Sequence, residues 1–238
     1  MPMENKRVLT LTENGIRRIV RESVTEILDE MAYPASFSME EFKKITTFKG
    51  RLEYCAARLP KLGRGSSRVV FKIDDEKCLK LAINRKGLAQ NEVEATPDFF
   101  LEDIGLVART YDHDENFLWV EMQLARRATK NDFKRLTPYD FDTMCEFITY
   151  NYNRYSRRHV IISPKYKKLF DNPDFYDTIY DTAFYAMYDY LGNYQPDIVG
   201  DLKKLSSWGV VKQGGQEELV LIDFGLNEDV YNNYYSRS

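Results

Sequence analysis

Histidine is the chemically versatile residue that this sequence most clearly lacks, with 2 in a chain of 238 residues. Two histidines almost exclude metal sites built on imidazole and catalysis by Ser/His or Cys/His pairs. Cysteine is also scarce, and Cys55, Cys78 and Cys145 are odd in number and far apart, which indicates free thiols in a reducing compartment. Any chemistry must rest on Asp, Glu, Lys and Arg side chains.

Long apolar runs and an excess of positive charge are missing too. No stretch approaches the roughly 18 to 20 apolar residues of a membrane span, and the N-terminal run MPMENKRVLTLTENG lacks the apolar segment of a secretory signal. The formal net charge of -3 gives no electrostatic footprint for nucleic acid. We therefore expect a cytoplasmic protein that binds neither membranes nor nucleic acid.

The N-terminal pattern, from Thr10 to Met31, predicts an amphipathic helix, because apolar residues recur at intervals of three and four. Thr10 and Glu13 match a capping box at its start. The charges oppose the helix dipole, with arginines early and acidic residues late, so the helix needs outside support. It either packs on its own domain or docks to a protein partner. With a linker from Ala32 to Ser38, it makes residues 1–50 an N-terminal arm.

After this arm the pattern changes to strands, and residues 51–125 form a predicted β-rich N-terminal lobe. Two strands enclose a polar turn, a short helix follows, and a buried strand closes the lobe. These elements are expected at Val69 to Ile73, Cys78 to Ile83, Lys86 to Ala95 and Phe117 to Leu124.

Residues 126–238 predict a mainly helical C-terminal lobe. Helices are expected from Phe141 to Tyr150 and from Phe175 to Leu191, followed by a hairpin that pairs Trp208 to Val211 with Leu219 to Ile222. Strands come first and helices later, without βαβ alternation. The chain is therefore predicted to have an α+β fold with two lobes.

A glycine-rich loop lies ahead of the first of these strands and contains Gly63, Gly65, Ser66 and Ser67. Glycines between two strands let backbone amides approach phosphate oxygens, since no Cβ intervenes. A plain hairpin loop has the same composition, so this run alone leaves both interpretations open.

Lys80 lies inside an apolar strand, and alternation places it on the same face as Cys78 and Ala82. A lysine there either meets an anion or reaches water from an edge strand. If Val70 shares that face with Cys78, the two form an apolar roof for a flat ring, with Lys80 beside its phosphates.

Glu92 and Glu94 are the candidates to pair with Lys80 from the following helix. Residues two apart cannot face the same way on a helix, so at most one of them does so, and we favour Glu94. A buried Lys/Glu pair orients the ammonium rather than adding much stability.

Two aspartates near the C-terminus complete the set. Asp223 ends the apolar run Leu219 to Ile222 as part of Asp-Phe-Gly, the pattern of a buried strand that delivers one carboxylate to a loop. Asp201 opens Asp-Leu-Lys ahead of the hairpin. It either carries chemistry or braces the hairpin, and Asp197 is a rival carboxylate.

In this order the motifs resemble the protein-kinase-like fold across roughly Arg51 to Leu226. The run GSSRVVFKIDD, a downstream AQN and a Trp-Gly before the final strand resemble small kinase-like proteins of tailed bacteriophages. The resemblance implies ATP and Mg²⁺ as cofactors, Lys80 and Glu94 as an ion pair, Asp201 as the catalytic base and Asp223 as the metal ligand. It further implies a nucleotide site formed by Gly63, Gly65, Ser66, Ser67, Val70, Cys78, Lys80, and the hinge residues Glu121 and Met122.

The sequence also departs from that pattern. Arg68 replaces the third glycine of the loop and either contacts phosphate or occupies its space. Val199 and Gly200 precede Asp201 where a regulated kinase has histidine and arginine, and Ser206 or Ser207 stands in place of the loop asparagine. With a short tail after Asp-Phe-Gly, we expect no activation segment. A minimal phosphotransferase is predicted, with a pseudokinase or a structural phage protein as the alternative.

Overall fold

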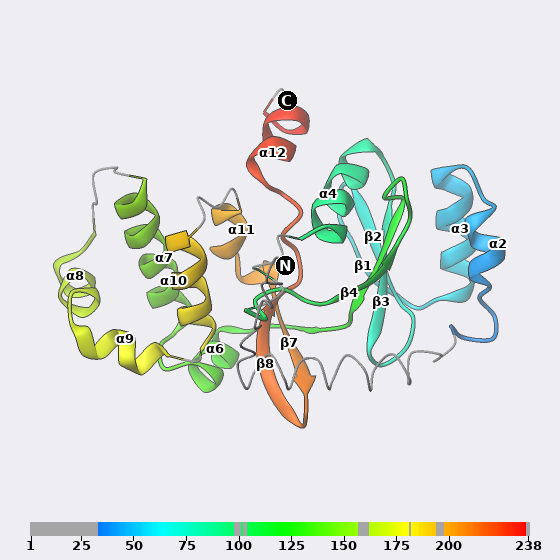
Figure 1. The fold of residues 1–238 in the computed structure, drawn as a ribbon. Helices are drawn as coiled ribbons and strands as arrows, with labels where there is room; N and C mark the ends of the chain where they lie inside the picture. The colour runs from blue at the N-terminus through cyan, green and yellow to red at the C-terminus, as the bar shows by residue number, and fades with distance from the viewer. Residues whose placement is uncertain are drawn as a thin grey trace, which may run out of the picture.

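The computed structural model describes residues 33–97, 101, 104–156, 162–180, 182–193 and 198–236. The helix predicted between Thr10 and Met31 and the rival carboxylate Asp197 lie outside these residues. The described part consists of a five-stranded antiparallel sheet with helices on both faces, a three-stranded sheet, and a group of helices, α6 to α10, beyond it (Figure 1). The fold class is therefore α+β, as predicted.

The five-stranded sheet has the strand order β1-β2-β3-β5-β4, with every neighbouring pair antiparallel. Lys80 on β3 lies opposite Val70 on β2 and Val120 on β5, so these three side chains share a face. The strands are β1 (Lys61–Arg64), β2 (Arg68–Lys72), β3 (Lys77–Ala82), β4 (Thr110–His113) and β5 (Trp119–Gln123).

Helices cover both faces of this sheet. On one face, α2 (Met39–Lys43) and α3 (Phe48–Arg58) enclose a small core that includes Phe42, Leu79 and Trp119. On the other face lies α4 (Arg85–Ala95), which corresponds to the helix predicted after β3 (Figure 1).

Helix α3 corrects the sequence prediction, which expected strand character from residue 51 onward. Thr47 caps the helix, because its hydroxyl accepts a hydrogen bond from the amide of Gly50 at 3.1 Å. Arg51 and Cys55, four residues apart, form the buried stripe. A stripe built partly from arginine gives a weak hydrophobic signal, and for this reason the helix was missed.

The second half of the chain is mainly helical and contains a hairpin, which is followed by a short helix where only a tail was predicted. Its elements are β6 (Arg126–Arg127), α6 (Lys130–Leu136), α7 (Phe141–Tyr155), α8 (Pro164–Phe170), α9 (Pro173–Ile179), α10 (Ala183–Asn193), α11 (Val199–Leu202), η1 (Leu205–Ser207), β7 (Trp208–Gln213), β8 (Gln216–Leu221) and α12 (Glu228–Tyr234). The hairpin is confirmed, and β6 adds a third strand to it.

One predicted helix, Phe175 to Leu191, is two helices in the structure, α9 and α10. Helix α9 ends at Ile179, whose carbonyl accepts hydrogen bonds from both the amide and the hydroxyl of Thr182. A hydroxyl that bonds nearby backbone competes with the helical ladder, which explains the break.

The main hydrophobic core runs from the Lys80 face of the sheet into the helices. It joins Val120 and Met122 of β5 to Phe147 of α7 and Phe184 of α10, and it includes Trp208 of the hairpin. Figure 1 accordingly shows the β7-β8 hairpin between the five-stranded sheet and α7 to α10. The three cysteines are free, and none of the described helices has the length and apolar character to cross a membrane.

Candidate active site

Lys80 and Glu94 form the centre of the candidate site. The ammonium of Lys80 lies 2.6 Å from Oε2 of Glu94, and both residues are buried. Glu92 is exposed, so of the two candidates it is Glu94 that meets the lysine. Helix α4 approaches the glycine-rich loop closely, since a Cβ at Gly87 would collide with the carbonyl oxygen of Ser67.

Glu94 accepts contacts at both carboxylate oxygens. Oε2 also meets Nη1 of Arg68 at 2.7 Å, while Oε1 accepts the backbone amides of Phe224 and Gly225, each at 3.2 Å. Burial alone would raise the pKa of Glu94, but the charges of Arg68 and Lys80 hold that pKa below its usual value. Glu94 is therefore ionised and serves as the common anchor of three segments.

Arg68 bridges this glutamate to Asp223. Its Nη2 lies 2.5 Å from Oδ1 of Asp223, whose side chain is 58% exposed, whereas Arg68 itself is buried. Burial opposes the charge of Arg68, yet Glu94 and Asp223 raise the pKa of the guanidinium above its ordinary value. The structure places the guanidinium of Arg68 between the carboxylates of Glu94 and Asp223.

The Asp-Phe-Gly segment is built tightly into this cluster. Lys80 donates a hydrogen bond to the carbonyl of Ile222, the residue before Asp223. A Cβ at Gly225 would lie 2.6 Å from the carbonyl oxygen of Gln90 in α4. Glycine is thus required here for close approach to the helix rather than for an unusual backbone angle.

Asp201 lies on α11 and is almost fully buried. Its Oδ1 accepts from the ammonium of Lys204 at 2.9 Å, and its Oδ2 accepts from the amide of Leu226 at 3.2 Å. Burial raises the pKa of Asp201; Lys204 opposes the rise, and the negative charge of Asp223 adds to it. Asp201 is therefore tied to the Asp-Phe-Gly segment.

Neither serine that stands in place of the loop asparagine, Ser206 or Ser207, is a strong candidate for a magnesium ligand. Ser206 is exposed and Ser207 is buried at the start of the hairpin. A neutral hydroxyl is a poorer ligand for magnesium than the carboxylate or amide oxygens that usually bind it.

The glycine-rich loop is held by contacts within the chain. The amide of Gly65 donates to the carbonyl of Arg68 at 2.9 Å, and the carbonyl of Ser66 accepts from the side chain of Asn84 at 2.9 Å. The hydroxyl of Ser67 donates to the side-chain oxygen of Gln90 at 2.6 Å. Gly63 lies opposite Val70 on the neighbouring strand.

The expected apolar roof has the predicted register. Val70 lies directly opposite Lys80, and Cys78 lies two residues from Lys80 on the same strand, so all three occupy one face. Cys78 and Met122 are buried in the main core, while Val70 is half-buried. The apolar surface beside the lysine therefore continues into the core.

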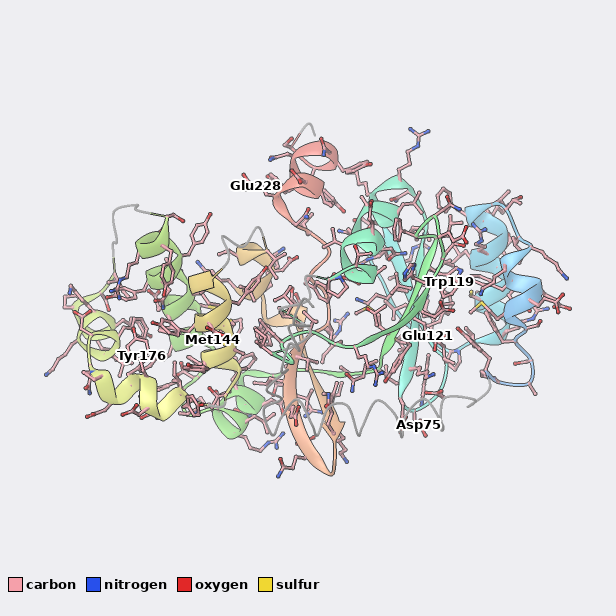
Figure 2. The ribbon with its side chains drawn as sticks, viewed as in Figure 1. Asp75, Trp119, Glu121, Met144, Tyr176 and Glu228 are labelled. Atoms are coloured by element: carbon pink, nitrogen blue, oxygen red, sulfur yellow. The ribbon has the colours of Figure 1, made fainter. Side chains whose placement is uncertain are left out.

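Glu121 is not brought to this cluster. It lies within β5, opposite Leu79, so its side chain is on the face away from Lys80. Figure 2 labels Glu121 and, two residues away on the same strand, Trp119, whose ring contacts Phe42 of α2. There it accepts a hydrogen bond from the hydroxyl of Tyr33 and lies 3.3 Å from the ammonium of Lys77. Burial and the charge of Glu121 raise the pKa of Tyr33 above its ordinary value. Because β5 ends at Gln123, the predicted hinge residues Glu121 and Met122 both lie inside the strand and not in the segment that follows it.

Two polar residues of α4 support the site without having been assigned a role from the sequence. Gln90 accepts a hydrogen bond from the hydroxyl of Ser67 and donates one to the hydroxyl of Tyr235 at 3.2 Å. Asn91 contacts Nη1 of Arg68 at 3.4 Å and donates to the carbonyl of Phe117 at 2.9 Å. The available signal was the polar run Ala-Gln-Asn on a helix that also carries the buried glutamate.

A cavity of about 550 Å³ lies on the other side of α4, away from the charged cluster. Its walls come from α4, α10, α12 and neighbouring loops, and include Glu92, Val93, Phe224 and Val230. Phe224 lines this cavity while its neighbour Asp223 contacts Arg68. The cavity is therefore separate from the candidate chemistry.

The donor set at Asp223 can be compared with the needs of a metal ion. Among the residues that the structure describes, no group of three His, Cys, Asp or Glu side chains gathers to hold a metal. Magnesium, however, commonly uses one or two protein carboxylates and takes its other ligands from phosphates and water. A largely exposed Asp223 fits that pattern, provided that Arg68 shares or releases it.

Comparisons with known proteins add little. No protein-family model and no curated protein matches the sequence. Among solved structures, the streptomycin–ATP–APH(2″)-IIa ternary complex is similar, with 12% sequence identity over 76% of this chain and 71% of that chain, and a TM-score of 0.30. A likeness this weak establishes no family.

Proposed function

We propose that this chain binds ATP together with Mg²⁺ at the cluster of Lys80, Glu94, Arg68 and Asp223, and transfers the terminal phosphoryl group to an acceptor. One observation carries the proposal: Lys80 in a central strand and the segment around Asp223 after the last strand meet at the buried carboxylate of Glu94. Buried ion pairs are costly to desolvate, and apolar residues often replace them without loss of stability. A cluster of charges here therefore favours recognition of a charged ligand.

The proposed roles follow from the positions of the side chains. Lys80, oriented by Glu94, meets phosphate oxygens, and Asp223 holds the cation. The apolar face of Val70, Cys78 and Met122 continues from the lysine and suits the base. When bound, Mg²⁺ neutralises charge on the phosphates.

In the proposed reaction, a hydroxyl oxygen of the acceptor attacks the terminal phosphorus of ATP. The bond from that phosphorus to the bridging oxygen breaks, and its electron pair leaves with ADP. The proton of the hydroxyl passes to Asp201. Burial raises the pKa of Asp201, which makes its carboxylate a better proton acceptor than an exposed aspartate.

A second candidate, a kinase-like interaction module without turnover, is favoured by the same contacts. Arg68 already neutralises Asp223, and both oxygens of Asp201 accept hydrogen bonds from within the chain. Under this alternative the cluster binds a nucleotide, or braces the fold, and no phosphoryl group moves.

Thermal-shift titration with ATP, with and without Mg²⁺, tests nucleotide binding. A ligand that binds only the native state adds about 2.7 kcal/mol of stability at a hundredfold excess over its Kd. We expect a magnesium-dependent rise in the unfolding temperature of the wild type and of Asp177→Ala, an exposed control on α9, but none in Asp223→Ala. Absence of a rise in the wild type at millimolar ATP would overturn the proposal.

A further inference from the structure

Two cations share one oxygen of Glu94. Nη1 of Arg68 lies 2.7 Å and Nζ of Lys80 lies 2.6 Å from the same Oε2. The other oxygen is occupied by the amides of Phe224 and Gly225. One carboxylate thus faces two positive charges, and the second counter-ion is Asp223, which Arg68 reaches with Nη2 at 2.5 Å.

The four side chains balance one another: Lys80 and Arg68 are positive, Glu94 and Asp223 negative. A divalent cation at Asp223 disturbs this balance, because it then lies close to the guanidinium. At a separation of about 5 Å in a water-like dielectric, that repulsion weakens cation binding roughly tenfold. The balance returns only if an anion enters with the metal.

The two ends of the guanidinium differ in how firmly they are held. Nη1 contacts the fully buried Glu94 and the buried Asn91, whereas Nη2 contacts Asp223, whose side chain is 58% exposed. Arg68 also begins β2 directly after the glycine-rich loop. A planar guanidinium with several donors suits phosphate oxygens.

We propose that Arg68 couples metal binding to phosphate binding: Nη1 stays on Glu94 while Nη2 exchanges the carboxylate of Asp223 for a phosphate oxygen when the magnesium complex arrives. This inference rests on the proposed function and adds a phosphate-binding and metal-gating residue to it. A divalent cation alone therefore binds weakly, and cation and polyphosphate bind together.

The test measures two ligands separately in Arg68→Gln. Binding of Mn²⁺ alone is followed by electron paramagnetic resonance, and binding of magnesium tripolyphosphate, which lacks a base, by calorimetry. We expect Mn²⁺ to bind Arg68→Gln about tenfold more tightly than the wild type, because the repelling charge is gone. Tripolyphosphate should bind about tenfold to a hundredfold more weakly, because a charge-assisted hydrogen bond is lost. Arg154→Gln, an exposed arginine near the end of α7 and away from the glycine-rich loop, should change neither affinity.

Arg68→Lys keeps the test decisive if Arg68→Gln does not fold. The lysine retains the positive charge but lacks the planar set of guanidinium donors. The Mn²⁺ affinity should therefore stay near that of the wild type, while tripolyphosphate binding weakens. Opposite shifts in Arg68→Gln, or this split in Arg68→Lys, support the coupling. If the wild type binds Mg²⁺·ATP but the Arg68 variants match it in both affinities, the coupling is wrong and the proposed function stands. If the wild type binds neither Mg²⁺·ATP nor magnesium tripolyphosphate, both the coupling and the proposed function are wrong.

Discussion

The ammonium of Lys80 lies 2.6 Å from the Glu94 carboxylate, and this contact joins the central strand of the sheet to helix α4. Through the other oxygen of Glu94, the same contact reaches the amides after Asp223. One buried carboxylate thus fixes the relative positions of the strand lysine, the loop arginine and the C-terminal aspartate. The cluster depends on Glu94 more than on any of its partners.

Glu94→Gln should therefore destabilise the protein severely. The substitution leaves Lys80 and Arg68 buried without their shared counter-ion, and breaking a buried ion pair typically costs about 3–5 kcal/mol. Chemical denaturation, with the unfolding free energy as the readout, checks this. Glu92→Gln, the exposed neighbour on the same helix, should change stability by no more than about 0.5 kcal/mol. Equal effects of the two substitutions would contradict the anchoring role of Glu94.

Gly225→Ala tests the close packing of the Asp-Phe-Gly segment. A Cβ there would lie 2.6 Å from the carbonyl oxygen of Gln90, so the segment must shift away from α4. We expect a loss of about 1–3 kcal/mol in the free energy of unfolding, as for other overpacked sites. A Cβ at Gly200 meets no atom within 4 Å, so Gly200→Ala should be neutral or stabilise by up to about 1 kcal/mol. Chemical denaturation of both variants gives the answer, and an undisturbed Gly225→Ala protein would count against the tight contact.

Local periodicity predicted the parts of the site that depend on one or two neighbouring elements. Strand alternation placed Lys80, Val70 and Cys78 on one face, and helical spacing allowed only one of the two glutamates to meet the lysine. Glu121 shows the limit of motif order. The order of the motifs suggested that Glu121 lies at a hinge. Strand alternation instead directs its side chain to the face of the sheet opposite Lys80.

The bridging role of Arg68 could not be predicted in this way. Its side chain can meet a phosphate or a carboxylate, and the choice depends on where the chain returns 155 residues later. Helix α3 was missed for a related reason: one of its two buried positions is Arg51, which periodicity counts as polar. Tertiary contacts decide such positions, and sequence patterns do not report them.

The pH dependence of stability checks the buried state of Asp201. Its pKa is raised in the folded protein, so the folded state binds more protons than the unfolded state above the usual aspartate pKa of about 3.9. Stability from this group is present below that value and is lost as pH rises through the folded pKa. Asp201→Asn cannot titrate at this position. Its unfolding free energy relative to the wild type should therefore increase as pH rises from about 4, measured by urea denaturation. A constant or falling difference would show that the pKa of Asp201 is not raised.

Phosphoryl transfer by Asp201→Asn separates the enzyme from the interaction module. If Asp201 accepts the proton of the acceptor, the variant should still show the magnesium-dependent thermal shift with ATP, because Lys80 and Asp223 are untouched. Its transfer of label from ATP to an acceptor, and its formation of ADP, should fall by about a hundredfold or more, the usual contribution of a positioned base. Asp177→Ala serves as the control for both measurements. Transfer that survives in Asp201→Asn would assign the base elsewhere, whereas a wild type that binds ATP and forms no ADP would favour the module. The hydrogen bonds from Lys204 and Leu226 to Asp201 would then be bracing contacts, and the cluster around Glu94 a site for binding alone.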